Sequence, residues 1–570
     1  MAVTLISWLY ILITAFFTGL LMRKTVKKGF GYEINSIDAI LVSGIVFMTV
    51  FAEVCSIFYP VGAEANIVLI VICIFSLFLN RKEIKDIILN SRPSVSFFIK
   101  AAVFAIVIAA ISSDVPHDYD TYLYHAQSIV WIEKYGAVKG LANLHNRFGY
   151  NSAFMCLQAL FGQWITGRQM HQMNGFLCLF MALFACSDNF ITNKKAPEAE
   201  DLLKLSALAY IIYAADSISS SGSDIMTMLL LIYLFAKWIH LYRNGSGYPL
   251  DIKTDAGRIK QGITEKNAVS YALLSMLAVF LCTVKLSAVP AVLLSLYPVC
   301  VLLKKRKFKT VAGFTVTALF IGLPYIIRNI IISGYLIYPM ESLDLFDPDW
   351  KVPAEVCRVD RIDIMKFGRG INGLDGDFSL TGWLQVWFRS LEFVPRLIVC
   401  IGMISLAVFV IMLVKAAVKK DRQALLRAFV TGVSGAGFLY WLLSSPLMRY
   451  GIVVVLIFNA VTIGLMLDEK SRRVYTVFLV CCVFFMLSGL TDNYKGKQIN
   501  MIFPEDYASF ECKEVKLPAG SGSVTVYMPA EGDQSGVDVF PATPEINPDY
   551  TELRGRDFSE GFRDKMSNRK

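Results

Sequence analysis

Residues 95–125 read VSFFIKAAVFAIVIAAISSDVPHDYDTYLYH, and this stretch decides how the chain folds. Its first part, 95–112, is almost entirely apolar, and its second part is rich in Asp, His and Tyr. An apolar run of this length predicts a membrane-spanning helix, because about 20 helical residues cross the hydrocarbon core of a bilayer. The polar part must then lie where the helix leaves the membrane, because charged groups are costly in lipid.

Similar apolar runs recur along the 570 residues of the chain. The chain is 55% hydrophobic and only 18% charged, which is too little charge for the exterior of a soluble protein of this length. We therefore predict an all-α polytopic membrane protein of about fourteen transmembrane helices. The spans are expected at residues 3–22, 37–59, 66–80, 95–112, 171–193, 204–216, 225–242, 270–284, 287–303, 310–327, 395–414, 428–444, 451–467 and 474–490.

The basic residues indicate the orientation of these spans. A net charge of +9 would suit a nucleic-acid partner, but the Lys and Arg residues cluster in short loops between spans. Short basic loops are typical of the cytoplasmic side of a membrane protein, so no nucleic-acid partner is expected. All the basic loops fall on the cytoplasmic side if the short run 152–166 is an interfacial helix rather than a span. Three hydrophilic segments are then external: 113–170, 333–392 and the tail from residue 491.

The tail is rich in Pro, Gly and Asp and contains one strand-like stretch at 523–527. It is too polar to enter the membrane and too irregular for a long helix. We expect a small irregular external segment, either an appended domain or an extended cap.

The first external loop holds most of the histidines of the chain, together with closely spaced Asp and Tyr residues. Four of the five histidines fall in or beside it, at positions 117, 125, 145 and 171. A helix predicted from about residue 121 to 134 would place Asp120, Tyr124 and Gln127 on one face. Asp118 and His125 are seven residues apart, about two helical turns. Such a group suits either of two roles. One is a base that deprotonates an alcohol, and the other is the binding of a divalent cation by Asp118 and Asp120.

Each of these residues also has a simpler interpretation. The acids of the loop can merely keep a solvated surface soluble, and His145 and Arg147, in a Gly-flanked turn, can either contact substrate or cap helix ends. Asp224 follows a Ser-rich turn at 217–223 and precedes an apolar run, where Asp is both a possible catalytic group and a good N-cap. The sequence is compatible with both the functional and the structural interpretation of these residues.

Three cations lie at the predicted outer ends of spans, against the usual charge bias: Lys285, Arg328 and Arg449. Positive groups at that boundary suit the binding of a phosphorylated, partly lipidic ligand. Each could instead be an anchor whose charged end extends to the interface.

These residues carry a resemblance to the C superfamily of membrane glycosyltransferases, which includes the protein O-mannosyltransferases and the lipid A aminoarabinose transferases. The superfamily has an Asp in the first large external loop, an Asp at the start of a later span and a lysine-bearing helix turn. The similar segments here are the loop around Asp120, Ser-Gly-Ser-Asp224-Ile-Met-Thr-Met-Leu-Leu-Leu and Thr283-Val-Lys285-Leu-Ser287.

More narrowly, several motifs resemble a bacterial family of multi-span membrane proteins, over roughly residues 95–565. They are Asp120-Thr-Tyr-Leu-Tyr-His125, Gly140-Leu-Ala-Asn-Leu-His145, Pro324-Tyr-Ile-Ile-Arg328-Asn329, Gly334-Tyr-Leu-Ile-Tyr338-Pro339, Leu553-Arg-Gly-Arg and Gly561-Phe-Arg563. The resemblance implies three parts: extra N-terminal helices at 1–94, a catalytic core similar to the C superfamily at 95–490, and the external segment at 491–570.

The resemblance implies transfer of a sugar from a polyprenyl-phosphate carrier to a glycan, lipid or protein acceptor on the outer face of the bacterial cytoplasmic membrane. Catalysis would rest on Asp120, with Asp118, His125 and Asp224 supporting it. Substrate would be bound by Lys285, Arg328, Arg449, Tyr124, His145 and Arg147. Some members of the superfamily use a divalent metal and others do not, so the cofactor stays undecided.

Two other functions compete with this one. A polysaccharide polymerase or ligase also uses polyprenyl-linked sugars, but it relies on arginines and a histidine in a large late loop. The loop 333–392 has Arg358, Arg361 and Arg369 and no histidine. A transporter favours charges near the middle of the bilayer and internal repeats, whereas the charges here gather at predicted helix ends.

Overall fold

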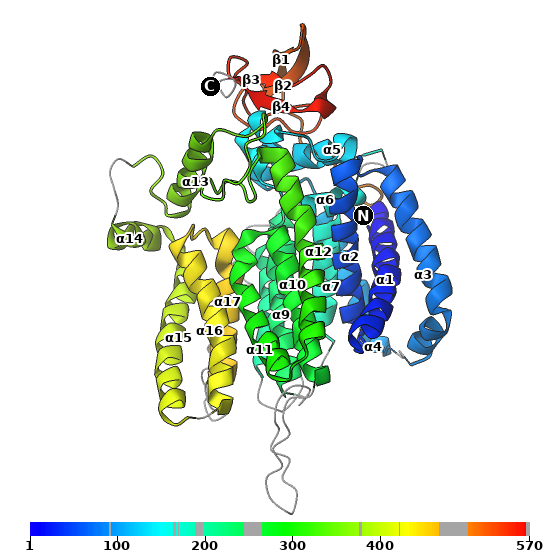
Figure 1. Ribbon diagram of the computed structural model, residues 1–570, viewed down its shortest axis with the longest axis vertical. Helices are drawn as coiled ribbons and strands as arrows, with labels where there is room; N and C mark the ends of the chain where they lie inside the picture. Colours follow the sequence, from blue (N-terminus) through cyan, green and yellow to red (C-terminus); the bar gives the residue numbers. More distant parts are fainter. Residues whose placement is uncertain are drawn as a thin grey trace, which may run out of the picture.

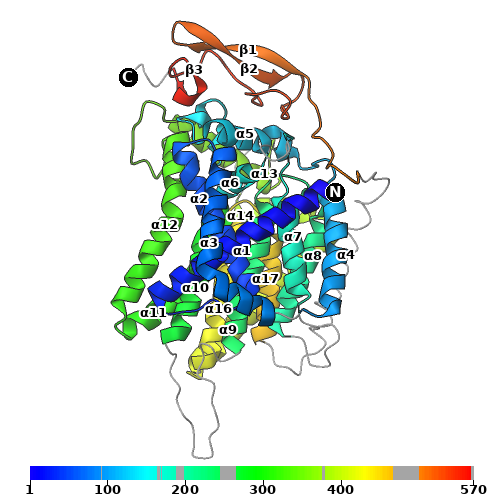
Figure 2. The same ribbon diagram turned by 90° about the vertical axis from the view of Figure 1, so that its right-hand side faces the viewer.

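The computed structural model describes residues 1–90, 93–162, 167–168, 170–187, 198–243, 265–374, 379–420, 422–466 and 500–565. Figure 1 shows most of the long helices running along the long axis of the molecule, with a small β-sheet at one end. We call residues 500–565, which carry this sheet, the cap. The two ends of the helical bundle are the cap end and the far end, and the turned view in Figure 2 shows the same division.

Within the described ranges, ten helical segments are long and apolar enough to cross a membrane, so the chain is a membrane-embedded helical protein. They are α1 (Ala2–Phe30), α2 (Ile37–Phe58), α3 (Ala63–Asn90), α4 (Val95–Ser112), α9 (Asp224–Arg243), the continuous pair η6 (Leu286–Ser295) and α11 (Leu296–Lys304), α12 (Phe308–Ser333), α15 (Phe393–Val418), α16 (Arg422–Leu443) and α17 (Met448–Met466). Each coincides with one of the predicted spans.

The other four predicted spans have different outcomes. Three coincide with shorter or less apolar helices: α7 (Met173–Ala185), α8 (Ala199–Tyr213) and α10 (Glu265–Val284), whose apolar part begins at Ala268. Helix α7 has 13 residues, about 20 Å of helix, which is less than the hydrocarbon thickness of about 30 Å. The span expected at 474–490 lies outside the described residues. The total of fourteen spans therefore stays a prediction.

The run at 152–166 forms a short helix, as expected, but not at the surface. Helix α6 (Ala153–Leu160) has eight residues, and all of them are buried. It packs beneath α5 (Ala126–Tyr135) and against α2. The apolar residues that suggested contact with lipid are covered by the protein itself.

The cap corrects the expectation of an all-α chain with an irregular tail. Its sheet has the order β2-β1-β3-β4, formed by β1 (Cys512–Ala519), β2 (Gly522–Pro529), β3 (Thr551–Leu553) and β4 (Phe562–Asp564). Strands β1 and β2 form an antiparallel hairpin, and β2 contains the stretch 523–527 that the sequence predicted as a strand. The alternation of polar and apolar residues at 523–527 gave a signal there, whereas the three-residue strands β3 and β4 are too short to give one.

The cap shares a hydrophobic core with the first external loop, so it is not a free tail. Trp131 and Leu141 of the loop are buried together with Leu517, Val526 and Phe562 of the cap. The backbone N–H of Phe562 also donates to the carbonyl of Lys139 at 2.9 Å. The boundary expected at residue 491 therefore separates two segments that pack as one unit at the cap end.

Candidate functional site

Two polar segments that lie about a hundred residues apart in the sequence come together at the cap end. The hydroxyl of Ser217 donates to the carboxylate of Asp118 at 2.8 Å, and the backbone N–H of Asp118 donates to the Ser220 hydroxyl at 3.2 Å. Gly222 lets the Ser-rich turn pass close to His125, because a Cβ at this position would lie 3.3 Å from the imidazole ring. The two segments that the sequence singled out are therefore one site.

Four charged side chains meet beside this contact, and we call them the cap-end cluster: Asp120, Asp224, Lys285 and Arg449. The Lys285 ammonium forms an ion pair with Asp224, and the Arg449 guanidinium forms one with Asp120. The Nε of Arg449 lies 3.7 Å from the second carboxylate oxygen of Asp224, so Arg449 links both acids. Two carboxylates and two cations thus form one continuous chain of charge.

Each member of the cluster stands where a helix begins or ends. Asp224 is the first residue of α9, and Arg449 is the second residue of α17. Lys285 has an extended backbone, with φ −157° and ψ 130°, between the end of α10 and the start of the 3-10 helix η6. Asp120 precedes η1 (Thr121–His125), a single π-helical turn that leads into α5. Helix ends place these side chains at the boundary of the bundle, where water can reach them.

An aromatic ring completes the cationic side of the cluster. The Lys285 ammonium lies 4.0 Å from the centre of the Tyr450 ring, and the Tyr450 hydroxyl accepts a hydrogen bond from Arg449 at 3.0 Å. Cations over aromatic faces are stabilised by the ring quadrupole. Tyr124, predicted to share a face with Asp120, interacts electrostatically with Asp120, Arg449 and Tyr450.

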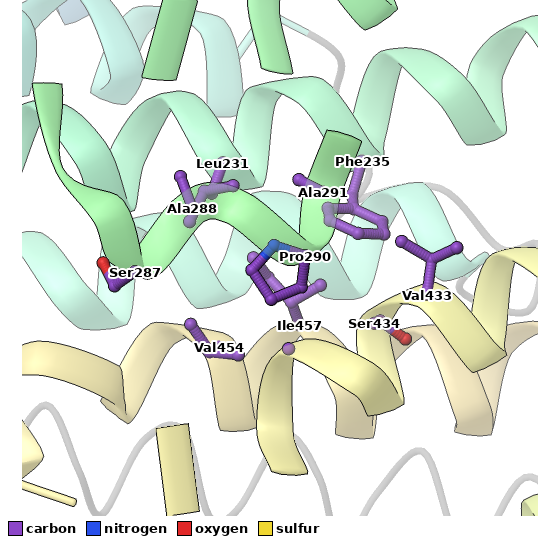
Figure 3. Close-up of a pocket in the computed structure, with 11 residues that line it drawn as sticks. Leu231, Phe235, Ser287, Ala288, Pro290, Ala291, Val433, Ser434, Val454 and Ile457 are labelled. Carbon is purple, nitrogen blue, oxygen red and sulfur yellow. The ribbon is translucent and has the colours of Figure 1, made fainter. Parts of the chain in front are cut away.

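An apolar cavity lies next to the cluster, farther along the same helices. Figure 3 shows side chains of α9, η6, α16 and α17 converging around Pro290, which is five residues from Lys285 in the chain. They enclose a cavity of about 20 Å³, which has room for about one water molecule. The lining is mostly aliphatic, with the hydroxyls of Ser287 and Ser434 as its polar groups. The charged side chains therefore rest on a packed hydrophobic layer.

Burial and charge act differently on the two loop carboxylates. Burial raises the pKa of Asp118 above its ordinary value, and the hydrogen bond from Ser217 offsets only part of this effect. Burial alone would also raise the pKa of Asp120, but the charge of Arg449, its hydrogen bond to Asp120 and the other neighbours together outweigh burial, and the pKa is lowered. Asp120 is therefore ionised at neutral pH, while Asp118 is the more basic of the two.

His125 lies buried between the two polar segments. Burial lowers the pKa of its imidazole to about 4, so the ring is neutral at pH 7. None of the described residues offers a hydrogen-bond partner to its Nδ1 atom. A neutral histidine with one open ring nitrogen can accept or donate a proton when a substrate hydroxyl approaches.

A second polar network joins the two large cap-end loops. It centres on Asp360 of α13 (Ala354–Gly368), whose carboxylate accepts hydrogen bonds from the Tyr150 hydroxyl and, at 3.0 Å, from the Asn146 amide. Arg147 lies 3.9 Å from the same carboxylate. His145 accepts a hydrogen bond from the backbone N–H of Arg147 at 3.2 Å and so caps a short 3-10 helix. Capping, one of the two interpretations left open, describes what His145 does in this structure.

Arg328 is not part of the cap-end cluster. Its exposed fraction is 2%, and it donates from Nε to Asn151 at 3.1 Å and from a terminal nitrogen to Ser56. It also interacts electrostatically with the fully buried carboxylate of Glu53 on α2. Of the three cations expected to share one phosphate site, Lys285 and Arg449 adjoin, whereas Arg328 lies in a sealed network. Phosphate binding by Lys285 and Arg449 stays a prediction.

The two loop acids considered as metal ligands are engaged with other side chains. Asp118 accepts a hydrogen bond from Ser217, and Asp120 is paired with Arg449. In the part of the chain that the structure describes, no three His, Cys, Asp or Glu side chains are grouped so that they could hold a metal ion.

Some residues of the site were not predicted from the sequence. Asp360 lies in a helix of mixed charge, RVDRIDIMK, where nothing distinguishes it from a solvated acid. Gln127 was expected on the face of Asp120, but its amide donates to the cap at Gly536 (3.0 Å) and Val539 (2.9 Å). The π-helical turn at 121–125 shifts the helical phase, which a regular period of 3.6 residues cannot anticipate.

These features define the class of the protein: a multi-span helical membrane protein with a charged cluster at one end, covered by a small β-sheet cap. The family model described as "Domain of unknown function (DUF8201)" matches residues 1–456, and the chain belongs to this family. The match includes the first three long helices, which are therefore part of the family domain. No curated protein and no solved structure matches the chain.

Proposed function

We propose that this protein is a membrane glycosyltransferase that moves a sugar from a polyprenyl-phosphate donor to a glycan, lipid or protein acceptor of the cell envelope. The observation that carries the proposal is the cap-end cluster, in which two carboxylates and two cations adjoin at the boundary of the helical bundle. Cations suit a lipid phosphate, and carboxylates suit the deprotonation of a hydroxyl.

The donor would be bound by Lys285 and Arg449. Both are partly accessible, with side chains 23% and 38% exposed, and both stand at ends of apolar helices, where a lipid phosphate resides. A phosphate would compete with Asp120 for Arg449. Loss of that ion pair would raise the pKa of Asp120, so donor binding would make the carboxylate a better base.

The chemical step needs one base and one leaving group. Asp120 removes the proton of the acceptor hydroxyl while the hydroxyl oxygen attacks C1 of the sugar. The bond between C1 and the phosphate oxygen breaks, and polyprenyl phosphate leaves with the electron pair. Lys285 and Arg449 stabilise the negative charge that develops on the leaving phosphate. Asp118 holds the loop against the Ser-rich turn, His125 offers its open ring nitrogen to the acceptor hydroxyl, and Asp224 orients both cations.

Transfer by the purified protein in lipid vesicles tests the proposal, with radiolabelled polyprenyl-phosphate sugars and an envelope extract as acceptor. Asp120→Asn should lower turnover by about 10²–10⁴-fold, the usual contribution of a positioned base. Asp344→Asn is the matched control, because Asp344 is an exposed acid that pairs with Lys351. Loss of activity in Asp118→Asn but not in Asp120→Asn would move the base two residues upstream, and full activity in both would refute the site.

We further propose that the cap end faces outward from the cytoplasmic membrane. Cysteine labelling with a membrane-impermeant reagent tests this, in a background in which the exposed Cys300 is replaced by serine. Ser523→Cys in the cap should react in intact cells, whereas Lys305→Cys at the far end should react only after permeabilisation. The reverse pattern would place the cluster on the cytoplasmic side.

The polymerase or ligase alternative receives less support from the late loop. Arg358 pairs with Glu355 at 2.6 Å, and Arg361 pairs with Glu341 at 2.7 Å, so both arginines are engaged within their own loop. Arg369 lies over the ring of Trp383 at 4.4 Å. These contacts hold the loop together, and the cations of the cluster come from other elements.

A further inference from the structure

A second cavity lies at the far end of the bundle, opposite the cap-end cluster. Its volume is about 410 Å³, within the range of about 300–1,000 Å³ that small-molecule sites occupy. Helices α1, α2, α9, α10 and α12 and the 31–36 connection enclose it. No residue of the cap-end cluster lines it.

The polarity of its lining changes with depth. Polar side chains surround the mouth, which is formed by the far ends of the helices; they include Tyr32, Asn35, Lys237 and His240. The deeper wall is mostly apolar and includes Val46, Leu277 and Ile321, with the small hydroxyl side chains of Ser43 and Thr317 among them. From Ala39 to Val46 the cavity follows seven residues of α2, about 10 Å into the bundle. A lipid in the bilayer is arranged in the same way, with its polar headgroup at the membrane surface and its apolar chains deeper.

The charges near the mouth favour a phosphate. Lys237 pairs with Asp38 at 2.6 Å, and Glu33 pairs with both Arg23 (2.6 Å) and Lys27 (3.0 Å). Lys237 and Glu33 line the cavity, and Asp38, Arg23 and Lys27 are their partners beside it. These three permanent cations and two carboxylates leave one positive charge at this end of the cavity. His240 adds a further polar group at 3.0 Å from Glu200, an acid that also pairs with Lys204.

The cavity also adjoins the lipid phase. Helix α12 contributes Thr317 and Ile321 to the lining, while Leu319 and Phe320 of the same helix are exposed on the outside of the bundle, by 53% and 65%. A lipid chain therefore needs to pass only one helix to move from the bilayer into the cavity.

We propose that this cavity binds a phospholipid from the leaflet on the far side of the membrane. The phosphate lies near Lys237 and His240, and one acyl chain lies against Val46, Leu277 and Ile321. This site is distinct from the proposed sugar-transfer site and does not depend on it.

Native mass spectrometry of the full-length protein in detergent tests the proposal, with palmitoyl-oleoyl phosphatidylglycerol as the probe. We expect one tightly retained lipid per chain. Thr317→Phe and Val46→Phe, which fill the cavity from two different helices, should each abolish this retention. Leu319→Phe, two residues from Thr317 but facing outward, is the matched control and should retain the lipid. Equal retention in the filled variants and the control would overturn the proposal.

A second arm tests the role of the phosphate. Lys237→Gln should weaken phosphatidylglycerol binding about tenfold, the effect of losing one charge-assisted contact. Palmitoyl-oleoyl glycerol has the same chains without the phosphate, and it should bind weakly to the wild type. Equal binding of the two lipids would overturn the phosphate assignment, and binding of inorganic phosphate alone at the same affinity would overturn the lipid. Thermal unfolding of each variant confirms that it is folded, and two independent filled variants keep the test decisive if one of them unfolds.

Discussion

Arg449 and Arg328 occupy equivalent positions in the sequence and opposite environments in the structure. Both are arginines at the cap end of an apolar helix, and both oppose the usual charge bias. The side chain of Arg449 is 38% exposed and contacts two carboxylates, Asp120 and Asp224. Asp224 also pairs with a second cation, Lys285. Arg328 is 2% exposed and is the charge that faces the buried Glu53. A cation at the end of a span thus indicates that an acid lies nearby. Whether a ligand can reach the cation depends on how far its side chain is exposed.

The largest change is expected when Arg328 is replaced, because a sealed arginine should contribute more to folding stability than an accessible one. Arg328→Met should lower the free energy of unfolding by about 2–6 kcal/mol, because it removes the donor from two buried or part-buried acceptors, the Asn151 amide oxygen and the Ser56 hydroxyl, at about 1–3 kcal/mol each. Thermal unfolding in detergent measures this loss. If Arg328→Met were as stable as the wild type, Arg328 would have no structural role.

The next effect concerns binding at the cap-end cluster. Lys285→Met should weaken the affinity for a polyprenyl phosphate by about 1.5–3 kcal/mol, the worth of one charge-assisted contact. Its melting temperature should change little, because Asp224 is partly exposed and keeps Arg449 at 3.7 Å. Binding of a fluorescent polyprenyl phosphate to the purified variant measures the affinity. Unchanged affinity combined with strong destabilisation would make Lys285 structural, like Arg328.

A smaller effect depends on pH. Burial lowers the pKa of His125 to about 4 and that of His145 to about 3, whereas both titrate near 6.5 in the unfolded chain. Between pH 6.5 and 4 the unfolded state binds more protons, so acid should destabilise the fold over this window. Removing one of these groups with His125→Gln should reduce the loss of stability between pH 7 and pH 5 by about 1–2 kcal/mol. Identical pH profiles for the variant and the wild type would show that the histidine is not buried in the neutral form.

The spans were the most predictable part of the molecule. Length and apolarity alone located ten long helices, from α1 to α17, because these properties belong to the local sequence. The cap was predicted only in part. Polar and apolar residues alternate along β2 at 523–527, and β2 pairs with the neighbouring β1. Residues 551–564 add β3 and β4 beyond β1, through contacts that local sequence does not encode.

The candidate site shows the same limit. Asp120, Asp224, Lys285 and Arg449 were predicted individually from their positions at span ends, and tertiary packing brings them together. Asp360 could not be predicted from the sequence. Its role is to accept hydrogen bonds from Tyr150 and Asn146, which lie more than two hundred residues away in the chain. Arg328 and Lys285 could not be distinguished, because burial depends on which helices pack around each side chain.

The most direct test of the cap-end cluster is to locate a bound donor. A polyprenyl phosphate with a photoreactive group next to the phosphate would be cross-linked to the full-length protein in lipid vesicles, and the labelled peptides would be mapped by mass spectrometry. We expect label near Lys285 and on the peptides that contain Asp120 or Arg449, with competition by unlabelled polyprenyl phosphate. Label confined to the far-end cavity, or the same pattern in the Lys285→Met/Arg449→Met double variant, would contradict this expectation.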